Sequence, residues 1–264
     1  MIDHTQLKPH APPKKIKELC EEAIAYNFKA VCVNPSYVKL SSELLKDSEV
    51  LVCSVVGFPL GSIPSDVKAH ETRRAVEDGA HEIDMVLNTG MFRAKEYDYC
   101  SDDVGAVVKA ASPEAHVKVI LETGYLTDEE IVKACQLCVE AGAAFVKTST
   151  GFGPMGAFED HVKLMRETVG PDIGVKAAGG IQNVRDALRM VNAGANRLGC
   201  SAGIAILEGL NWIKYSGGFM AEDIPCHECP SRAASMSKQP KEVYMYYKEK
   251  CRDCPYKEYN KFYE

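Results

Sequence analysis

The sequence predicts an α/β fold: a (β/α)8 TIM barrel with a short Cys-rich C-terminal extension. Eight short β-branched runs recur at intervals of roughly 20 to 35 residues. Each interval carries an amphipathic helical pattern, and polar residues stand near the C-terminal end of one run after another. Eight parallel strands joined by regular helical crossovers close most readily into a barrel, with the active site at the C-terminal ends of the strands. A doubly wound open sheet is the alternative.

The predicted strands follow one another along the chain. The first four occupy residues 2–5, 30–33, 51–58 and 82–87, and the second four occupy residues 117–123, 144–150, 174–180 and 196–202. Between the fifth and sixth strands, the segment TDEEIVKACQLCVEAG predicts a helix that Thr127 caps and Gly142 ends. Cys135 and Cys138 lie on that helix, where we interpret them as small core residues rather than as a redox pair.

The composition predicts one large hydrophobic core and a small-molecule ligand. The chain has 264 residues, of which 46% are hydrophobic, and a formal net charge of -6. An acidic chain has no overall positive field to attract nucleic acid or an anionic membrane, so we expect neither as a partner. No run reaches about 18 consecutive apolar residues, and the N-terminus lacks a signal-peptide pattern. These features indicate a cytoplasmic protein.

The composition changes near residue 215. This change predicts a TIM-barrel domain at residues 1–214 and a Cys-rich extension at residues 215–264. The extension holds four of the 11 cysteines as two C-x-x-C pairs, with 21 residues between the inner cysteines. Such spacing is typical of a structural zinc site with four thiolates, and it also suits an iron–sulfur cluster. Two disulfides or four free thiols are the alternatives. The candidate metal ligands are Cys226, Cys229, Cys251 and Cys254.

Two lysines and an aspartate lie within strand-like runs. Lys147 stands in AAFVKTSTGFG, Lys176 in GVKAAGG and Asp84 in EIDMVL. Because side chains alternate along a strand, both lysines can point into the barrel from consecutive strands. Burial and a neighbouring cation both disfavour a protonated amine, so one lysine can become a nucleophile that forms a Schiff base with a carbonyl. Asp84 can stabilise the other ammonium group or exchange protons with it.

Five runs, IDHT, VVGFP, EIDMVLN, FVKTSTG and GVKAAGGI, stand in this order along the predicted strands. Together they resemble the deoxyribose-phosphate aldolase family, which consists of class I aldolases with a TIM-barrel fold, from residue 2 to about residue 210. The resemblance implies reversible cleavage of 2-deoxy-D-ribose 5-phosphate into acetaldehyde and D-glyceraldehyde 3-phosphate. It also implies that Lys147 forms the Schiff base, that Lys176 lowers the pKa of Lys147, and that Asp84 completes a proton relay.

The resemblance further implies which residues bind the substrate. Asp3 and Thr5, in the first strand, correspond to positions that support the second lysine and line the pocket. The positions that match the phosphate site of the family are Gly151, Gly179, Gly180, Gly199 and Ser201. Barrel enzymes bind phosphate there with backbone N–H groups and the N-terminus of a following helix. Phe152 and Gln182 depart from the pattern, because some members carry a cation at these places.

The expected partners are a small phosphorylated sugar and aldehydes, and a homo-oligomer is a candidate assembly. The iminium is the electron sink in this chemistry, so no cofactor is expected for catalysis. A related Schiff-base aldolase would act instead on another sugar or on a non-phosphorylated aldehyde. A catalytically inactive barrel would serve as a metal-bound binding module.

One motif raises a dinucleotide-binding oxidoreductase as a further alternative. GFGPMG, residues 151–156, matches the G-x-G-x-x-G fingerprint of such enzymes. However, it follows the sixth strand rather than the first, and Asp172 precedes the seventh strand instead of ending it. The context of the motif therefore disfavours dinucleotide binding.

Overall fold

The computed structural model describes residues 1–215, with side chains through Asn211. Eight parallel strands close into a barrel in which each strand pairs with its neighbours in chain order. They are β1 (Ile2–Gln6), β2 (Ala30–Val33), β3 (Leu51–Val56), β4 (Glu82–Val86), β5 (His116–Ile120), β6 (Phe145–Lys147), β7 (Gly174–Ala178) and β8 (Arg197–Cys200). The closed ring confirms the predicted (β/α)8 barrel and excludes the open sheet.

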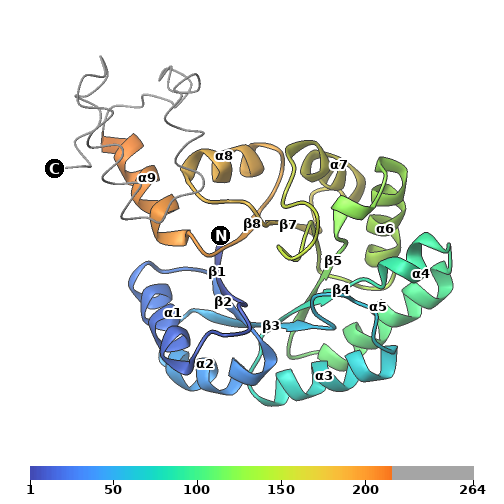
Figure 1. The fold of residues 1–264 in the computed structure, drawn as a ribbon, viewed down its shortest axis with the longest axis horizontal. Helices are drawn as coiled ribbons and strands as arrows, with labels where there is room; N and C mark the ends of the chain where they lie inside the picture. The colour runs from blue at the N-terminus through green and yellow to red at the C-terminus, as the bar shows by residue number, and fades with distance from the viewer. Residues whose placement is uncertain (216–264) are drawn as a thin grey trace. The chain divides into compact units, whose positions relative to one another are not determined.

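Helices surround the ring of strands, as Figure 1 shows. They are α1 (Pro13–Ala25), α2 (Val38–Leu45), α3 (Ser65–Glu77), α4 (Thr89–Arg93), α5 (Tyr97–Ala111), α6 (Asp128–Glu140), α7 (Glu159–Val169), α8 (Val184–Asn192) and α9 (Gly203–Tyr215). Two short 3-10 helices, η1 (Pro35–Tyr37) and η2 (Thr123–Tyr125), follow β2 and β5. Within the described range, no helix is both long enough and apolar enough to cross a membrane.

The helix predicted after the fifth strand forms as α6. Its N-terminus is a capping box, in which Thr127 accepts a hydrogen bond from the N–H of Glu130 and the Glu130 carboxylate accepts one from the N–H of Thr127. Beyond its last turn, Gly142 takes a φ of 90° that directs the chain towards β6. Cys135 and Cys138 are buried free thiols, and burial raises the pKa of Cys135 to about 12. Both thiols pack as core residues.

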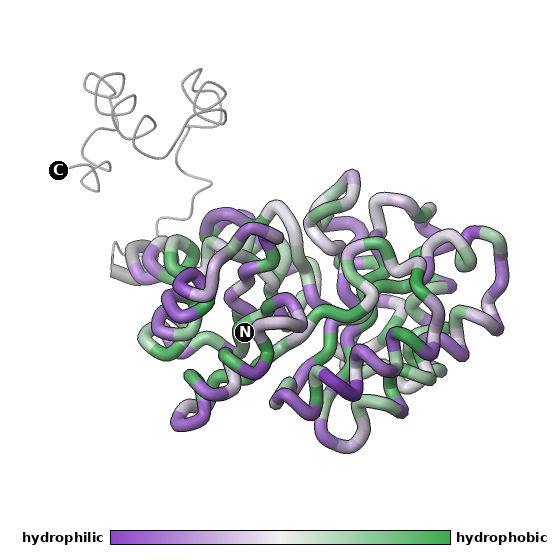
Figure 2. The backbone as a smooth tube through the Cα atoms, turned by 60° about the horizontal axis from the view of Figure 1, so that its bottom comes forward, coloured by the Kyte–Doolittle hydropathy of each residue, from purple (hydrophilic) through white to green (hydrophobic). Residues whose placement is uncertain are grey.

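Alternation along the strands divides the apolar residues into two layers. Outward-facing residues such as Ile83, Met85 and Val146 pack beneath the helices in the larger core. A smaller cluster is centred on β2 and β3, and its members are Leu7, Ala30, Cys32, Cys53 and Val55. Figure 2 shows hydrophobic and hydrophilic stretches alternating along the backbone. Strand β1 and strands β4 to β8 contribute charged side chains to the lumen instead.

Several strands end before the hydrophobic runs do. After Lys147, the hydroxyl of Thr148 takes over the pairing with β7: it accepts a hydrogen bond of 3.1 Å from the N–H of Ala178 and donates one of 3.2 Å to the carbonyl of the same residue. After Ile120, the backbone of Glu122 adopts a left-handed φ of 54°. The loops at the mouth of the barrel therefore begin earlier than predicted.

Candidate active site

Asp84 accepts hydrogen bonds from three lysines in the lumen. The residues on either side of it in β4 belong to the outer core, so the alternation of the strand turns its carboxylate inward. Lys147 Nζ lies 2.6 Å and Lys176 Nζ 2.8 Å from Asp84 Oδ2. Lys118 Nζ lies 2.9 Å from Oδ1 of the same carboxylate. The structure thus brings together Lys147, Lys176 and Asp84, and it adds Lys118 to them.

The register of the strands arranges these lysines on two levels. Lys147 and Lys176 are register partners on β6 and β7, and they share one oxygen of Asp84, so their nitrogens are neighbours. On β5, the register partner of Lys147 is Ile120, whereas Lys118 pairs with Phe145. Lys118 therefore lies one level below Lys147.

A lower group of charges supports the carboxylates. Arg197 Nη1 lies 2.8 Å from Asp3 Oδ1 and 2.9 Å from Glu82 Oε2. Lys118 Nζ lies 2.7 Å from the same oxygen of Glu82, and Lys176 Nζ lies 2.5 Å from Asp3 Oδ2. Each carboxylate is held between at least two cations. We call these buried residues the charged network: Asp3, Glu82, Asp84, Lys118, Lys147, Lys176 and Arg197.

The network keeps its central carboxylate and two of its lysines, Lys118 and Lys176, charged. Burial would raise the pKa of Asp84, but the three lysine ammonium groups outweigh burial and hold this pKa well below its usual range. Burial would lower the pKa of Lys176, but the carboxylates of Asp3 and Asp84 raise it well above its ordinary value. At neutral pH, Lys176 is therefore an ammonium group, which gives Lys147 the cationic neighbour that the sequence predicts.

A pocket of about 440 Å³ opens above the network, at the C-terminal ends of β1, β6, β7 and β8. Lys147 is the member of the charged network that lines it. Asp3 does not line it, because this residue is fully buried beneath Lys176. A pocket of this size and position suits a small-molecule ligand. The other predicted substrate-binding residues all line it: Thr5, Gly151, Gly179, Gly180, Gly199 and Ser201.

Two of these glycines shape the backbone around the site. A Cβ at Gly199 would lie 2.9 Å from Lys176 Cε, so the missing side chain leaves room for this lysine. Gly179 has a φ of 87°, and its carbonyl accepts a 2.9 Å hydrogen bond from the N–H of Ala157. A Cβ at Gly156 would lie 2.4 Å from that carbonyl oxygen. The close approach of two loops at the pocket therefore requires glycine on both sides.

The N-terminus of α8, beside the pocket, is already capped. The Asn183 side chain accepts a 3.0 Å hydrogen bond from the N–H of Asp186, and the Asp186 carboxylate accepts one of 3.1 Å from the N–H of Gln182. The N–H of Gln182 thus has an anionic partner and is not available to phosphate. On the other side of the pocket, Phe152 packs edge-on against Phe58 with 5.4 Å between the ring centroids.

Four other polar residues at strand ends serve local structure. His4 bonds to a glutamate of α1 at 2.6 Å, and Asn34 donates to a carbonyl of the loop that follows β1. Asn88 caps α4. Glu122 accepts hydrogen bonds from the N–H and the hydroxyl of Thr150, which holds the loop after β6. Position at a strand end is therefore not sufficient evidence of a role in chemistry.

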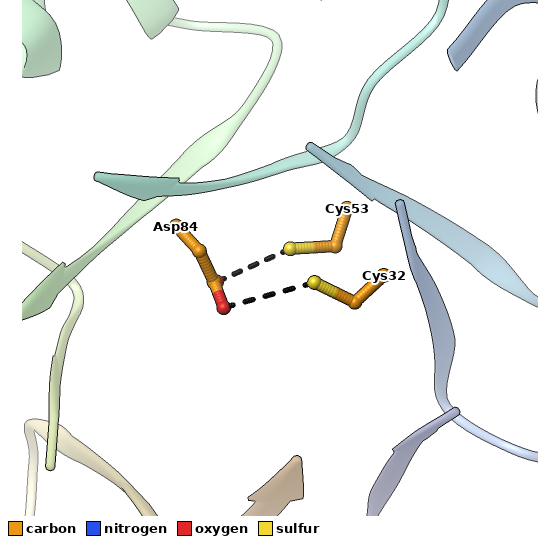
Figure 3. A group of neighbouring side chains, drawn as sticks. All are labelled: Cys32, Cys53 and Asp84. Atoms are coloured by element: carbon orange, nitrogen blue, oxygen red, sulfur yellow. Dashed lines mark hydrogen bonds between the residues drawn. The ribbon is translucent and has the colours of Figure 1, made fainter. Parts of the chain in front are cut away.

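Two thiols point toward Asp84, as Figure 3 shows. Cys53 Sγ lies 3.1 Å from Oδ1, and Cys32 Sγ lies 4.0 Å from Oδ2. One ligand atom from each residue lies within 4.8 Å of the others, a spacing that fits a metal ion. However, Asp84 already binds three ammonium groups, and Lys118 lies 3.3 Å from Cys53 Sγ. A metal ion would meet these positive charges at short range, so we assign no metal to this cluster.

The sequence interpretation missed four members of this site: Glu82, Lys118, Arg197 and Cys53. A signal for Lys118 is present in the run HVKVI, where it stands between two valines of the outer core. Lys147 likewise follows a residue of the outer core, Val146. Glu82 and Arg197 are the first residues of their strands, where a charged side chain ordinarily reaches solvent.

A lysine at the mouth of a (β/α)8 barrel, with a second lysine and a carboxylate beside it, is typical of an enzyme whose lysine amine attacks carbonyl compounds. The sequence model of the protein family described as DeoC/LacD family aldolase matches residues 1–209. The chain belongs to this family of aldolases, and the sequence resemblance is confirmed.

Curated relatives and a solved structure agree with this assignment. A deoxyribose-phosphate aldolase of Clostridium perfringens is 56% identical over 209 residues, which are 79% of this chain and 93% of the relative. The enzyme of the same name from Thermococcus kodakarensis is 57% identical over 211 residues, which are 79% of this chain and 94% of the relative. A tetrameric deoxyribose phosphate aldolase from Aeropyrum pernix has a TM-score of 0.75 and 36% identity, over 80% of this chain and 89% of that one.

Proposed function

We propose that the chain is a Schiff-base (class I) aldolase that reversibly cleaves 2-deoxy-D-ribose 5-phosphate into acetaldehyde and D-glyceraldehyde 3-phosphate. One observation carries the proposal: Lys147 lines the pocket, and its Nζ shares Asp84 Oδ2 with Lys176. This geometry combines a nucleophilic amine with a proton relay beneath it. Relatives that the chain matches over most of their length are named for this activity.

The first step forms the Schiff base on Lys147. Lys147 reacts as the neutral amine of the network, and its Nζ, which lies 2.6 Å from Asp84 Oδ2, attacks the aldehyde carbon of the open-chain sugar. One proton of this amine and one proton supplied through Lys176 leave with the carbonyl oxygen as water, and a protonated Schiff base remains on Nζ. Asp84 Oδ2 and Lys176 Nζ lie 2.8 Å apart, so these two groups can pass on the protons that the step moves.

The second step breaks the carbon–carbon bond. The C2–C3 electron pair moves to form the C1–C2 double bond of an enamine, and the C3 hydroxyl loses its proton as D-glyceraldehyde 3-phosphate leaves. The enamine then takes up a proton at C2, and water hydrolyses the iminium to acetaldehyde and free Lys147. Because the iminium accepts the electrons, the cleavage itself requires neither a metal nor a cofactor.

The formal charges of the network support Lys147 as the reacting amine. Four cations, Lys118, Lys147, Lys176 and Arg197, face the three carboxylates of Asp3, Glu82 and Asp84. The buried charges therefore balance when one lysine is a neutral amine, and balance is favoured where the dielectric constant is low. Among the three lysines of the network, Lys147 is the one that an aldehyde in the pocket meets.

A related aldolase for a non-phosphorylated aldehyde is the second candidate. Two lining residues favour it, because Phe152 and Gln182 are uncharged where some family members carry a cation. The two candidates share the Schiff-base chemistry and differ only in the group at the far end of the substrate.

We also propose a reducing, cytoplasmic location and self-association. The seven cysteines within the described range are buried and free, as expected where thiols stay reduced. The Aeropyrum pernix relative is described as tetrameric, which supports an oligomer for this chain. Light scattering of the purified protein measures its assembly.

Borohydride reduction in the presence of acetaldehyde tests the reactive lysine. Reduction converts the Schiff base into a stable secondary amine, which mass spectrometry of a digest locates. We expect one adduct at Lys147 and no adduct there in Lys147→Ala. The Lys176→Ala variant should still form the adduct, but at a shifted pH, because Lys147 loses its charged neighbour.

The control is Lys109→Ala, which removes an exposed lysine of α5 and should trap acetaldehyde like the wild type. An equal yield of adduct in Lys147→Ala would exclude Lys147 as the Schiff-base residue. If the folded wild-type protein neither traps acetaldehyde nor cleaves the sugar, the inactive barrel that acts as a binding module becomes the better hypothesis.

A further inference from the structure

We infer that Lys8 is the cation that binds the phosphate group of the substrate. This inference rests on the proposed function and adds a binding residue to it. Lys8 lies in the loop between β1 and α1 and lines the same pocket as Lys147. These two lysines are the charged residues of the pocket lining, and no lining residue is acidic. The pocket therefore favours an anionic ligand.

Lys147 is in the wrong place to bind the phosphate itself. In the Schiff base its nitrogen is bonded to C1, whereas the phosphate is attached at C5, at the opposite end of the sugar. The cation that meets the phosphate must approach from another part of the pocket. The loop of Lys8 satisfies this condition, because it follows β1, and β1 pairs with β8, whose end carries Ser201.

The two lining positions at which some members of the family carry a cation are uncharged in this chain. Phe152 presents an aromatic ring that packs against Phe58. Gln182 has its N–H bonded to the carboxylate of Asp186, which adds a negative charge on that side of the pocket. Apart from Lys147, Lys8 is the residue of the pocket lining that carries a positive charge.

The backbone around Lys8 is held, while its side chain is exposed. The N–H of Lys8 donates a 3.2 Å hydrogen bond to Gln6 Oε1, and the carbonyl of Lys8 accepts one of 3.1 Å from the N–H of Ala11. Within the part of the chain that the structure describes, no carboxylate forms an ion pair with Lys8. A long, unpaired lysine at the rim of a pocket can reach a terminal phosphate as a mobile point charge.

Two substrates that differ only in the phosphate test this inference. For Lys8→Gln, we expect the KM for 2-deoxyribose 5-phosphate to rise about 10-fold to 100-fold, the range for losing a hydrogen bond to a charged group. The kcat for this substrate should change little, and the kcat/KM for 2-deoxyribose should change much less than that for the phosphorylated sugar. Lys8→Arg, which keeps the charge, should restore most of the preference for the phosphorylated sugar.

Lys109→Gln is the matched control, since it removes the same charge from an exposed face of α5 and should affect neither substrate. If Lys8→Gln keeps the wild-type ratio of kcat/KM for the two sugars, the inference is wrong and the proposed function stands. If the wild type cleaves neither sugar, the proposed function fails. Calorimetric titration with inorganic phosphate then decides on Lys8: weaker binding by Lys8→Gln supports the inference, and equal binding overturns it.

Discussion

The ammonium group of Lys118 binds one oxygen of Asp84 and leaves the other oxygen to Lys147 and Lys176. It lies 2.9 Å from Asp84 Oδ1 and 2.7 Å from Glu82 Oε2, which leaves Asp84 Oδ2 to Lys147 and Lys176. Lys118 is also the strongest of the charges that lower the pKa of Asp84 against the effect of burial. Because Lys118 does not line the pocket, we expect it to act through Asp84, as a positioning residue.

Replacing Lys118 with methionine is expected to lower kcat/KM by about 10-fold or more and to move the acid limb of the pH profile to higher pH. Without this ammonium group, the pKa of Asp84 rises, so the carboxylate takes up a proton at a higher pH than in the wild type. Profiles of kcat/KM against pH measure the shift, with Lys109→Met as the control. A less active Lys118→Met variant with an unmoved acid limb would indicate a packing role only.

Single residues differ in how far the sequence predicts them. Lys147, Lys176 and Asp84 stand within the quoted family motifs, so the resemblance marks them. Lys118 stands outside those motifs, and its burial is explained by its ion pairs with Asp84 and Glu82 on the neighbouring strand. Its partners are more than 30 residues away in the chain, so no local pattern encodes them.

At the scale of the elements, the recurrence of β-branched runs located all eight strands but not their ends. The hydroxyl of Thr148 replaces a backbone partner of β7, and this kind of side-chain competition is invisible in a hydrophobic pattern. The amphipathic pattern of the helices likewise fails to predict one buried ion pair. Lys68 and Asp103, on the facing helices α3 and α5, are fully buried and lie 2.5 Å apart, and Lys68 also donates a 2.9 Å hydrogen bond to the carbonyl of Val86. An amphipathic pattern places such a lysine in solvent.

Removing one partner of this ion pair is expected to destabilise the barrel. Asp103→Ala should lower the free energy of unfolding by about 3 to 5 kcal/mol, because it leaves the charge of Lys68 buried without a counterion. Urea denaturation measures the change, and Asp102→Ala, which alters an exposed neighbour, should cost less than about 1 kcal/mol. The double variant Lys68→Met with Asp103→Leu should recover most of the free energy of unfolding that Asp103→Ala loses. A double variant as unstable as Asp103→Ala would show that packing, rather than the buried charge, is responsible.

At the scale of the whole molecule, the barrel and its family follow from the order of the strands, whereas the C-terminal extension does not. The barrel repeats one strand–helix unit eight times, so each unit supports the interpretation of the next. The extension predicted at residues 215–264 has no such repeat, and its four cysteines lie outside the described residues. Its zinc or iron–sulfur site therefore stays a prediction.

The purified protein is expected to contain about one zinc ion per chain, bound by the four cysteines of the extension. Replacing Cys226 and Cys229 with serine should release the metal and leave aldolase activity intact, because the proposed chemistry needs no metal. Elemental analysis measures the metal content, and visible absorption distinguishes an iron–sulfur cluster from zinc. Reduced protein that binds neither metal would favour the alternatives of disulfides or free thiols.

The depth at which each lysine lies also protects the barrel from its own proposed product. Acetaldehyde forms a Schiff base with any neutral amine that it can reach, so in a lumen with several lysines it could modify the wrong one. Lys118 and Lys176 have no exposed surface and lie behind the residues that line the pocket. They lie out of reach of the aldehyde, so among these three lysines only Lys147 would react and be regenerated in each proposed turnover.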